Sequence, residues 1–243
     1  MSYVLPLSNP ASEPVALADV KNYLRVDSTL TIDDTLIGTL ISAAREHAER
    51  ITGKALAQRT FRQVLDSFPY YTDTVQSQLA YPPSYYSLPR YSTTLWNYSQ
   101  MIKLFYPPVI SVQQIRFIDN NGVAQTVHQD VDFILDRQTY PARIFPVPGQ
   151  YWPPNYYTPN SVEIDFTAGY TNNPAAAPDT HTVTSPTGQQ PDSIVPVGIP
   201  FSIVRDIYML VAFWYENRNQ PAPPEIDALF YAEACIDFQP TRG

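Results

Sequence analysis

The positions of the helices constrain this fold most, because two strongly helical stretches lie near opposite ends of the 243-residue chain, at about residues 14–53 and 199–238. The segment between them is rich in Tyr, Pro, Val and Ile, a composition typical of strands and loops. Neither helical end is long enough to bury a sufficient core alone. The sequence therefore predicts an α+β fold: a helical bundle formed by both chain ends, with an inserted antiparallel, β-rich, sandwich-like domain.

Hydrophobic periodicity predicts four helices, at residues 14–26, 32–52, 200–217 and 224–237. In the second helix, apolar residues from Ile32 to Ile51 recur at steps of one, three and four, which indicates one buried face. Gly53 is expected to follow its last turn, because glycine adopts the left-handed conformation that ends many helices.

The middle of the chain predicts seven short strands, and Asn120-Asn121-Gly122 gives a tight turn between two of them. The expected strands cover residues 58–66, 101–106, 112–119, 123–127, 132–136, 142–145 and 161–167. The expected domains are therefore a discontinuous helical domain at 1–57 and 199–243, a β-rich domain at 58–170 with an aromatic loop at 67–100, and a mobile loop at 171–198.

Composition excludes several classes of function. The formal net charge is −8, so the chain lacks the excess of Lys and Arg that most nucleic-acid binders need. Cys235 is the single cysteine, which rules out an intrachain disulfide and a Cys-based zinc site. The first residues do not resemble a signal peptide, and no apolar run approaches the roughly 20 residues of a membrane span. We expect a soluble protein without a membrane partner.

The sequence contains no constellation that indicates catalysis. Phosphate loops, dinucleotide fingerprints, zinc helices and nucleophile elbows are all absent from it. Asp130, Asp132 and Asp136 could serve a carboxylate-based hydrolase, but carboxylates at strand ends are ordinary turn residues. We expect no enzyme activity, no catalytic residue, no cofactor and no metal.

Three segments, in order and correctly spaced around the β insert, resemble the head–tail connector (adaptor) proteins of tailed phages, in their long branch with a β insert. The segment Glu13–Asp27 resembles the opening helix of that family, Ala43–Leu56 its second helix and exit, and Trp214–Arg218 the end of its third helix. One departure is Ala16, which stands where the family usually has a Ser or Thr helix cap.

The resemblance implies a structural virion protein of the bacteriophage neck, assembled in the host cytoplasm. It implies a homo-oligomeric ring, commonly of twelve subunits, that lies under the portal protein, docks stopper, tail or other neck proteins and extends the DNA channel without specific DNA binding. The apolar face of the last helix could equally fold back on the chain's own core. Because the family's C-terminal region reaches the portal, the resemblance favours docking, and the expected portal-binding residues are Phe230, Tyr231, Ile236, Phe238 and Arg242. The expected contacts to the tail side or to a neighbouring subunit are Tyr85, Tyr86, Tyr91 and Trp96.

A carbohydrate-binding β module of a phage tail or host-recognition protein is the alternative. In that interpretation Trp96, Tyr85 and Tyr86 form a stacking platform for sugar rings. It explains the aromatic loop but not the paired helical ends.

Overall fold

The computed structural model describes residues 2–69, 100–137, 141–156, 158–170, 198–218 and 220–234. The chain divides into two compact units. The β unit consists of Met1–Leu5, Arg62–Leu104 and Val112–Phe166, and the helical unit of Pro6–Phe61, Phe105–Ser111 and Thr167–Gly243. None of the described helices is both long enough and apolar enough to cross a membrane.

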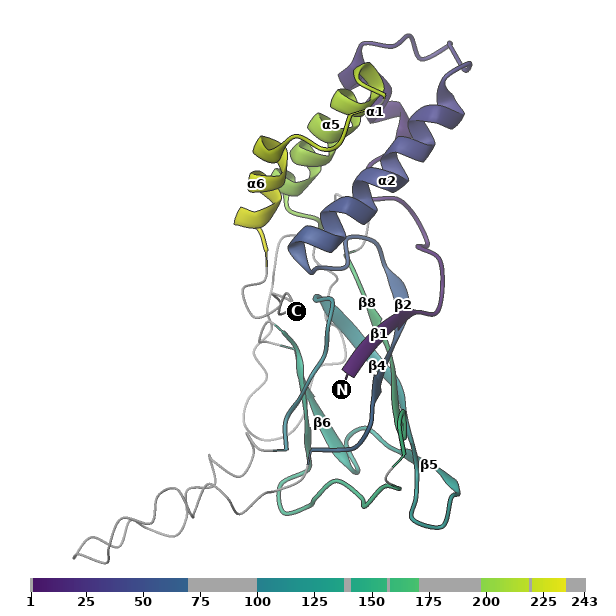
Figure 1. Ribbon diagram of the computed structural model, residues 1–243, viewed down its shortest axis with the longest axis vertical. Coiled ribbons are helices and arrows are strands. Elements are labelled where there is room, and N and C mark those ends of the chain that lie inside the picture. Colours follow the sequence, from purple (N-terminus) through teal and green to yellow (C-terminus); the bar gives the residue numbers. More distant parts are fainter. Residues whose placement is uncertain are drawn as a thin grey trace, which may run out of the picture. The chain divides into compact units, whose positions relative to one another are not determined.

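The helical unit contains the four helices of the described chain, α1 (Leu17–Leu24), α2 (Asp34–Thr52), α5 (Phe201–Glu216) and α6 (Pro224–Ala232) (Figure 1). Helix α2 packs against each of the other three, so residues from both ends of the sequence share one core. Its buried residues are Val15, Val20, Ile37, Ile41, Ala44, Ala48, Leu56, Tyr170, Ile203, Ile207, Leu210, Val211, Ile226 and Phe230.

The ends of these helices follow from local chemistry. Gly53 closes α2 with a φ of 67°, a conformation that a residue without a Cβ adopts at no steric cost. Ala16 precedes α1 and makes no side-chain capping hydrogen bond, as expected of a side chain that has no acceptor. Pro224 opens α6, where its missing N–H has no intrahelical partner to lose.

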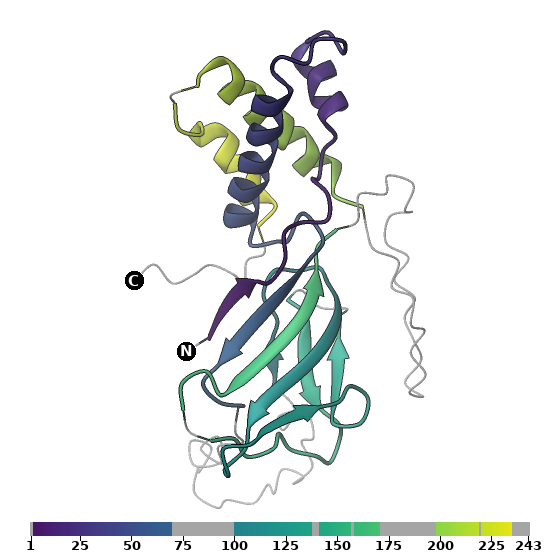
Figure 2. The same cartoon turned by 90° about the vertical axis from the view of Figure 1, so that its right-hand side faces the viewer.

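The strands form two sheets. The five-stranded sheet has the order β1 (Ser2–Pro6), β2 (Arg59–Leu65), β8 (Val162–Ala168), β4 (Val109–Ile118) and β5 (Ala124–Val127). The three-stranded sheet has the order β3 (Ile102–Lys103), β7 (Arg143–Pro146) and β6 (Phe133–Asp136), with antiparallel pairing throughout. In Figure 2 the arrows of β2, β8 and β4 lie side by side and alternate in direction.

Aromatic side chains fill the centre of the β unit. Phe68 stacks on Trp152 with ring centroids 4.9 Å apart and meets Phe117 edge to face at 5.5 Å. The buried Trp152 donates its indole N–H to the Gln100 carbonyl at 2.7 Å, so the one polar atom of this ring is satisfied.

The structure confirms the predicted α+β class with antiparallel sheets, and it differs from the predicted elements in detail. Strand β1 was not predicted; it belongs to the β unit, although residues 1–57 were expected in the helical domain. Phe105–Ser111 belongs to the helical unit, although it was expected in the β-rich domain. The expected start of the second helix at Ile32 is also wrong, because α2 begins at Asp34.

Candidate interaction surfaces

The C-terminal helix α6 is folded onto the core of its own helical unit. Ile226 and Phe230 are buried there, and Phe230 is completely inaccessible. The expectation that Phe230 packs against a portal subunit is therefore wrong for this conformation, because its ring already fills the chain's own core. Tyr231, the next residue, points away from that core and remains 53% exposed.

Polar contacts also hold α6 in place. The Nε2 atom of His47 lies 2.7 Å from the Asp227 carboxylate, and Nδ1 lies 2.8 Å from an Arg50 guanidinium nitrogen. At the other end of α6, Glu233 accepts a hydrogen bond from the Ser202 hydroxyl at 2.8 Å. His47 thus links α2 to α6.

Most of the predicted contact residues lie outside the described part of the chain. These are Tyr85, Tyr86, Tyr91 and Trp96 of the aromatic loop and Ile236, Phe238 and Arg242 of the C-terminal segment. Among the described residues near α6, Tyr231 and Phe201 are the large exposed side chains, and Phe201 is 86% exposed at the start of α5.

The α1–α2 loop, residues 25–33, is held in place by a buried lysine. The Lys21 side chain is only 4% exposed, and its ammonium group donates to the Leu30 carbonyl at 2.6 Å and the Ser28 carbonyl at 3.2 Å. It also pairs with the Asp34 carboxylate at 2.8 Å. All three donors of this cation are directed at the loop and at the start of α2.

This same loop exposes two aliphatic side chains, Leu30 at 52% and Ile32 at 82%. Sequence periodicity assigned Ile32 to the buried face of the second helix, but the residue precedes the helix. The available signal was Asp33-Asp34, because adjacent carboxylates mark a helix N-terminus and place Ile32 before it.

A buried carboxylate organises the exit from α2. Glu49 accepts hydrogen bonds from Arg45 at 3.0 Å, from Arg59 at 2.6 Å and from the Leu56 backbone N–H at 2.9 Å. Burial by itself would lower the pKa of Arg45, but the charges of Glu49 and Glu13 outweigh it and raise the pKa above its ordinary value. These charges are structural, since every one is paired.

A second charged cluster crosses the five-stranded sheet. The buried Asp165 of β8 accepts two hydrogen bonds from Arg62 of β2, at 2.6 and 2.8 Å, and one from Gln114 of β4 at 2.9 Å. Beside it, Arg116 pairs with Glu163 at 2.6 Å. The cluster balances its own charge, so it links three strands and leaves no excess charge for a ligand.

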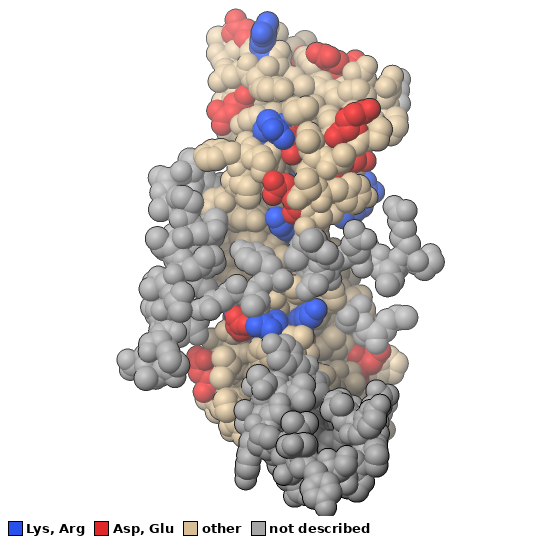
Figure 3. Space-filling model, turned by 90° about the vertical axis from the view of Figure 1, so that its left-hand side faces the viewer, with Lys and Arg blue, Asp and Glu red and all other residues tan. Residues whose placement is uncertain are grey.

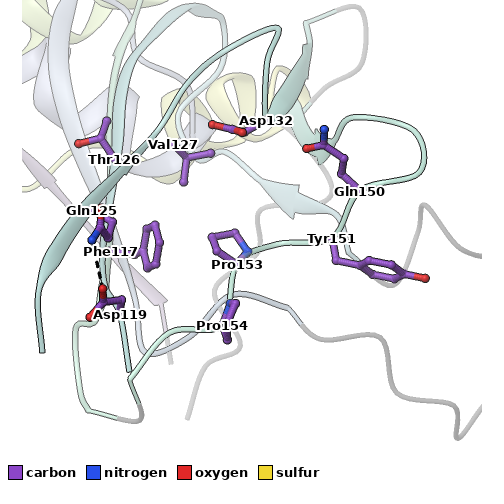
Figure 4. A pocket seen from close by; sticks show the side chains of 10 residues that line it. All are labelled: Phe117, Asp119, Gln125, Thr126, Val127, Asp132, Gln150, Tyr151, Pro153 and Pro154. Carbon is purple, nitrogen blue, oxygen red and sulfur yellow. Dashed lines mark hydrogen bonds between the residues drawn. The ribbon is translucent and has the colours of Figure 1, made fainter. Parts of the chain in front are cut away.

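The β unit also has a cavity of about 410 Å³ lined by the β4–β5 hairpin and the segment around Tyr151 (Figure 4). Its carboxylates serve the local turns: Asp119 caps the backbone N–H groups of Asn121 and Val123, and Asp132 that of His128. Asp136 pairs with Arg143 at 2.5 Å. The structure therefore gives Asp132 and Asp136 the ordinary roles of turn and ion-pair residues.

In the described ranges, no group of three His, Cys, Asp or Glu residues lies close enough together to hold a metal ion. On the face shown in Figure 3, charged side chains are scattered and much of the described surface is uncharged. Only 16% of the residues in the chain are charged. Such surfaces suit contacts with other proteins better than contacts with small charged substrates.

Part of the chain is similar in sequence to a known protein family. Residues 14–81 match the sequence model of the phage gp6-like head-tail connector protein family. The match includes α1, the α1–α2 loop, α2 and β2. No curated protein sequence matches the chain.

Solved structures of gene transfer agent (GTA) particles contain chains of the same fold. The chain is similar to a component of the neck of an empty GTA particle computed with C6 symmetry, with a TM-score of 0.64. It is also similar to chains in the virion of a native GTA particle, at 0.61, and in the neck of a native GTA particle computed with C12 symmetry, at 0.59. Each comparison has 20% sequence identity and covers 99% of this chain and 98% of the other. The chain thus carries, at residues 14–81, the sequence pattern of the phage gp6-like head-tail connector family, on a fold that it shares with a GTA neck component from end to end.

Proposed function

We propose that this chain is a structural protein of the neck of a tailed-phage-like particle, where it acts as the head–tail adaptor. One observation carries the proposal: the connector-family match and the neck-protein fold coincide, and the fold match extends over nearly the full length of both chains. Neither observation depends on the other, because one compares sequence over 14–81 and the other compares structure over the whole chain.

In this proposal, copies of the chain form a ring under the portal and extend the DNA channel toward the tail. The similar chains come from necks computed with C6 and C12 symmetry, which supports a ring of identical subunits. The formal charge of −8 on each copy supports a channel that lets DNA slide, because it offers no excess of cations to hold phosphates. The ring is assembled in the host cytoplasm and remains in the virion.

The C-terminal segment provides the proposed contact with the portal. Tyr231 supports this assignment, because it is exposed on α6 while its neighbour Phe230 is buried. The contact then consists of Tyr231 together with Ile236, Phe238 and Arg242 beyond the end of the helix. Tyr85, Tyr86, Tyr91 and Trp96 remain the proposed contacts to the tail side or to a neighbouring subunit.

The function is tested by deleting the gene that encodes this chain and examining the particles that are then produced. We expect DNA-filled heads and free tails that do not join, and plasmid-borne wild-type protein should restore complete particles. Normal particles made without the protein would refute the proposal. Heads that fail to package DNA at all would place the protein earlier in assembly than an adaptor acts.

A further inference from the structure

The turn between β4 and β5 contains Asn121-Gly122, the single Asn-Gly pair of the sequence. Because glycine has no side chain, its backbone nitrogen approaches the side chain of a preceding Asn more easily than that of any other residue. Both residues are exposed, and a Cβ added at Gly122 would meet no atom within 4 Å. Within the described part of the chain, the Asn121 side-chain amide makes no hydrogen bond. Solvent therefore reaches this peptide bond freely.

An Asn-Gly pair can lose ammonia by a reaction within its own backbone. The Gly122 nitrogen gives its proton to a solvent base and forms a bond to Cγ of Asn121. The bond from Cγ to the side-chain nitrogen breaks, and that nitrogen takes up a proton and leaves as ammonia. One water molecule then opens the resulting succinimide ring at either of its two carbonyls. One opening gives aspartate, and the other gives isoaspartate, in which the main chain runs through the side-chain carbon.

The folded turn holds the attacking nitrogen away from this reaction. The Gly122 N–H donates to the Asp119 carbonyl at 2.9 Å, and the Asp119 N–H donates to the Val123 carbonyl at 2.9 Å. Asn121 does not have a positive φ, so residues 119–122 form a type I turn, in which Gly122 has a φ of 79°. The ψ of the third residue of a type I turn is about 0°, which directs the next nitrogen away from that residue's own side chain. Ring closure needs this nitrogen to eclipse the Cα–Cβ bond, so the turn must open before Asn121 can react.

Asp119 holds the turn closed. Its Oδ1 atom accepts hydrogen bonds from the backbone N–H groups of Asn121 and Val123, both at 2.9 Å, and its Oδ2 atom accepts one from the Gln125 side chain at 3.1 Å (Figure 4). The contacts from Val123 and Gln125 lower the pKa of Asp119, so its carboxylate stays charged and is a strong acceptor near neutral pH. Together with its own carbonyl, Asp119 fixes the N–H groups of three consecutive residues, 121–123.

We propose that Asn121 is a site of slow, spontaneous deamidation and that Asp119 sets its rate by holding the turn closed. Each conversion adds one negative charge to the chain. Isoaspartate also lengthens the main chain between the paired residues Ile118 and Ala124, which disturbs the contacts to Asp119. Because the hairpin lines the cavity of the β unit, the conversion changes one wall of that cavity. This chemistry depends on the hairpin alone and holds whether or not the chain is an adaptor.

Ageing of the purified wild-type protein tests the site. After prolonged incubation, fragmentation of the hairpin peptide should show, at Asn121, the mass gain of an amide converted to an acid. An isoaspartyl methyltransferase should transfer a labelled methyl group to the same peptide. Asn120 is the internal control, because it is also exposed but is followed by a residue with a side chain. The rate should rise with pH, since the attacking nitrogen must lose its proton.

Asp119→Ala tests the control of the rate. We expect this variant to deamidate at Asn121 at least about tenfold faster, because the loss of a hydrogen bond to a charged group typically shifts an opening equilibrium by that factor. Hydrogen exchange at the Gly122 amide should become faster by a similar factor, since both reactions need the same opening. The matched control is Asp132→Ala, which removes a carboxylate contact to the His128 N–H at the other end of β5 and should leave the rate unchanged.

If Asp119→Ala folds poorly, Asp119→Ser provides the same test, because its hydroxyl can still hold one of the two N–H groups and should give an intermediate rate. Modification at Asn120 in place of Asn121, or no modification in wild type and the Asp119 variants, would overturn the proposed site. Equal rates in wild type and Asp119→Ala, or equal acceleration by Asp132→Ala, would overturn the role of Asp119. Each of these results leaves the adaptor function standing.

Discussion

Gly169 is a position where the backbone itself requires glycine. It follows β8 with a φ of 119°, and its N–H donates to the Pro108 carbonyl at 2.9 Å. A Cβ at this position would overlap the backbone of Ala57 and Gln58, which cannot move as a flexible side chain would. The requirement for glycine therefore has two causes, the dihedral angle and the close approach.

We expect Gly169→Ala to lower the free energy of unfolding by about 1–3 kcal/mol, the usual cost of a strained or overpacked position. Gly38→Ala is the matched control, because Gly38 lies within α2 with open space where the Cβ would be. That change should raise the stability by about 0.5–1 kcal/mol through helix propensity. Thermal melting measures both, and equal effects of the two variants would contradict the packing argument.

Asp165, on β8 of the five-stranded sheet, is expected to make the stability of the protein depend on pH in the acid range. Its burial would raise the pKa of the carboxyl, but hydrogen bonds from Arg62 and Gln114 and the arginine charges outweigh burial and lower the pKa below its ordinary value of 3.8. A lowered folded-state pKa means that the stabilisation is present above the unfolded value and is lost as the pH falls through the folded value.

We therefore expect the stability to decrease below about pH 4, and we expect Asp165→Asn to reduce the slope of that decrease. Chemical denaturation between pH 2 and 7 measures the slope. Glu163→Gln is the control, since its partly exposed carboxylate should contribute less. A variant with the wild-type slope would show that another group carries the acid sensitivity.

At the scale of elements, the sequence predicts the long periodic helices and the hairpin well, because their signals are local. The face of α2 and the turn at Gly122 follow from spacing and from glycine alone. Strand β1 was missed because a short edge strand that contains Pro6 has no alternation of buried residues to detect. The sequence left the burial of Phe230 open, since an amphipathic helix shows an apolar face but not which surface covers it.

The candidate surfaces and charged clusters also differ in whether a local sequence signal could have predicted them. The charged clusters around Glu49 and Asp165 join residues far apart in sequence, so no spacing rule could find them. The exposure of Ile32 was hidden because this residue continues the helical period by chance, and only the helix start at Asp34 separates it from the buried face.

Two truncations separate the structural from the docking part of the C-terminal region. Ending the chain after Ala234 keeps α6 whole, so we expect an unchanged melting temperature and loss of binding to the portal. Ending it after Gln220 removes Ile226 and Phe230 from the core and should lower stability by at least about 3 kcal/mol, the usual cost of losing one buried phenylalanine. If the shorter chain melts like wild type, α6 does not belong to the core. If the longer one binds portal normally, the contact lies elsewhere.

At the scale of the whole molecule, the charge of the chain and the function proposed for it can be tested together. A channel protein must let DNA pass, so the assembled ring must not neutralise phosphates. With a formal charge of −8 and most described arginines paired inside the chain, the isolated protein has few free cations to offer.

We expect no binding of double-stranded DNA by the purified protein at about 0.15 M salt, where nonspecific DNA binders reach dissociation constants of roughly 10⁻⁴–10⁻⁶ M. Fluorescence anisotropy of a labelled duplex, measured up to millimolar protein and again at low salt, provides the test. A charge-shifted variant, with Asp19, Glu216 and Glu225 each replaced by Lys, is the positive comparison and should bind more strongly than wild type at low salt. These three carboxylates are exposed on helices of the described chain, so the changes alter charge without removing a turn. Binding by the wild-type protein that weakens steeply with salt would remove the electrostatic basis for a sliding channel, while the similarity to neck proteins would remain.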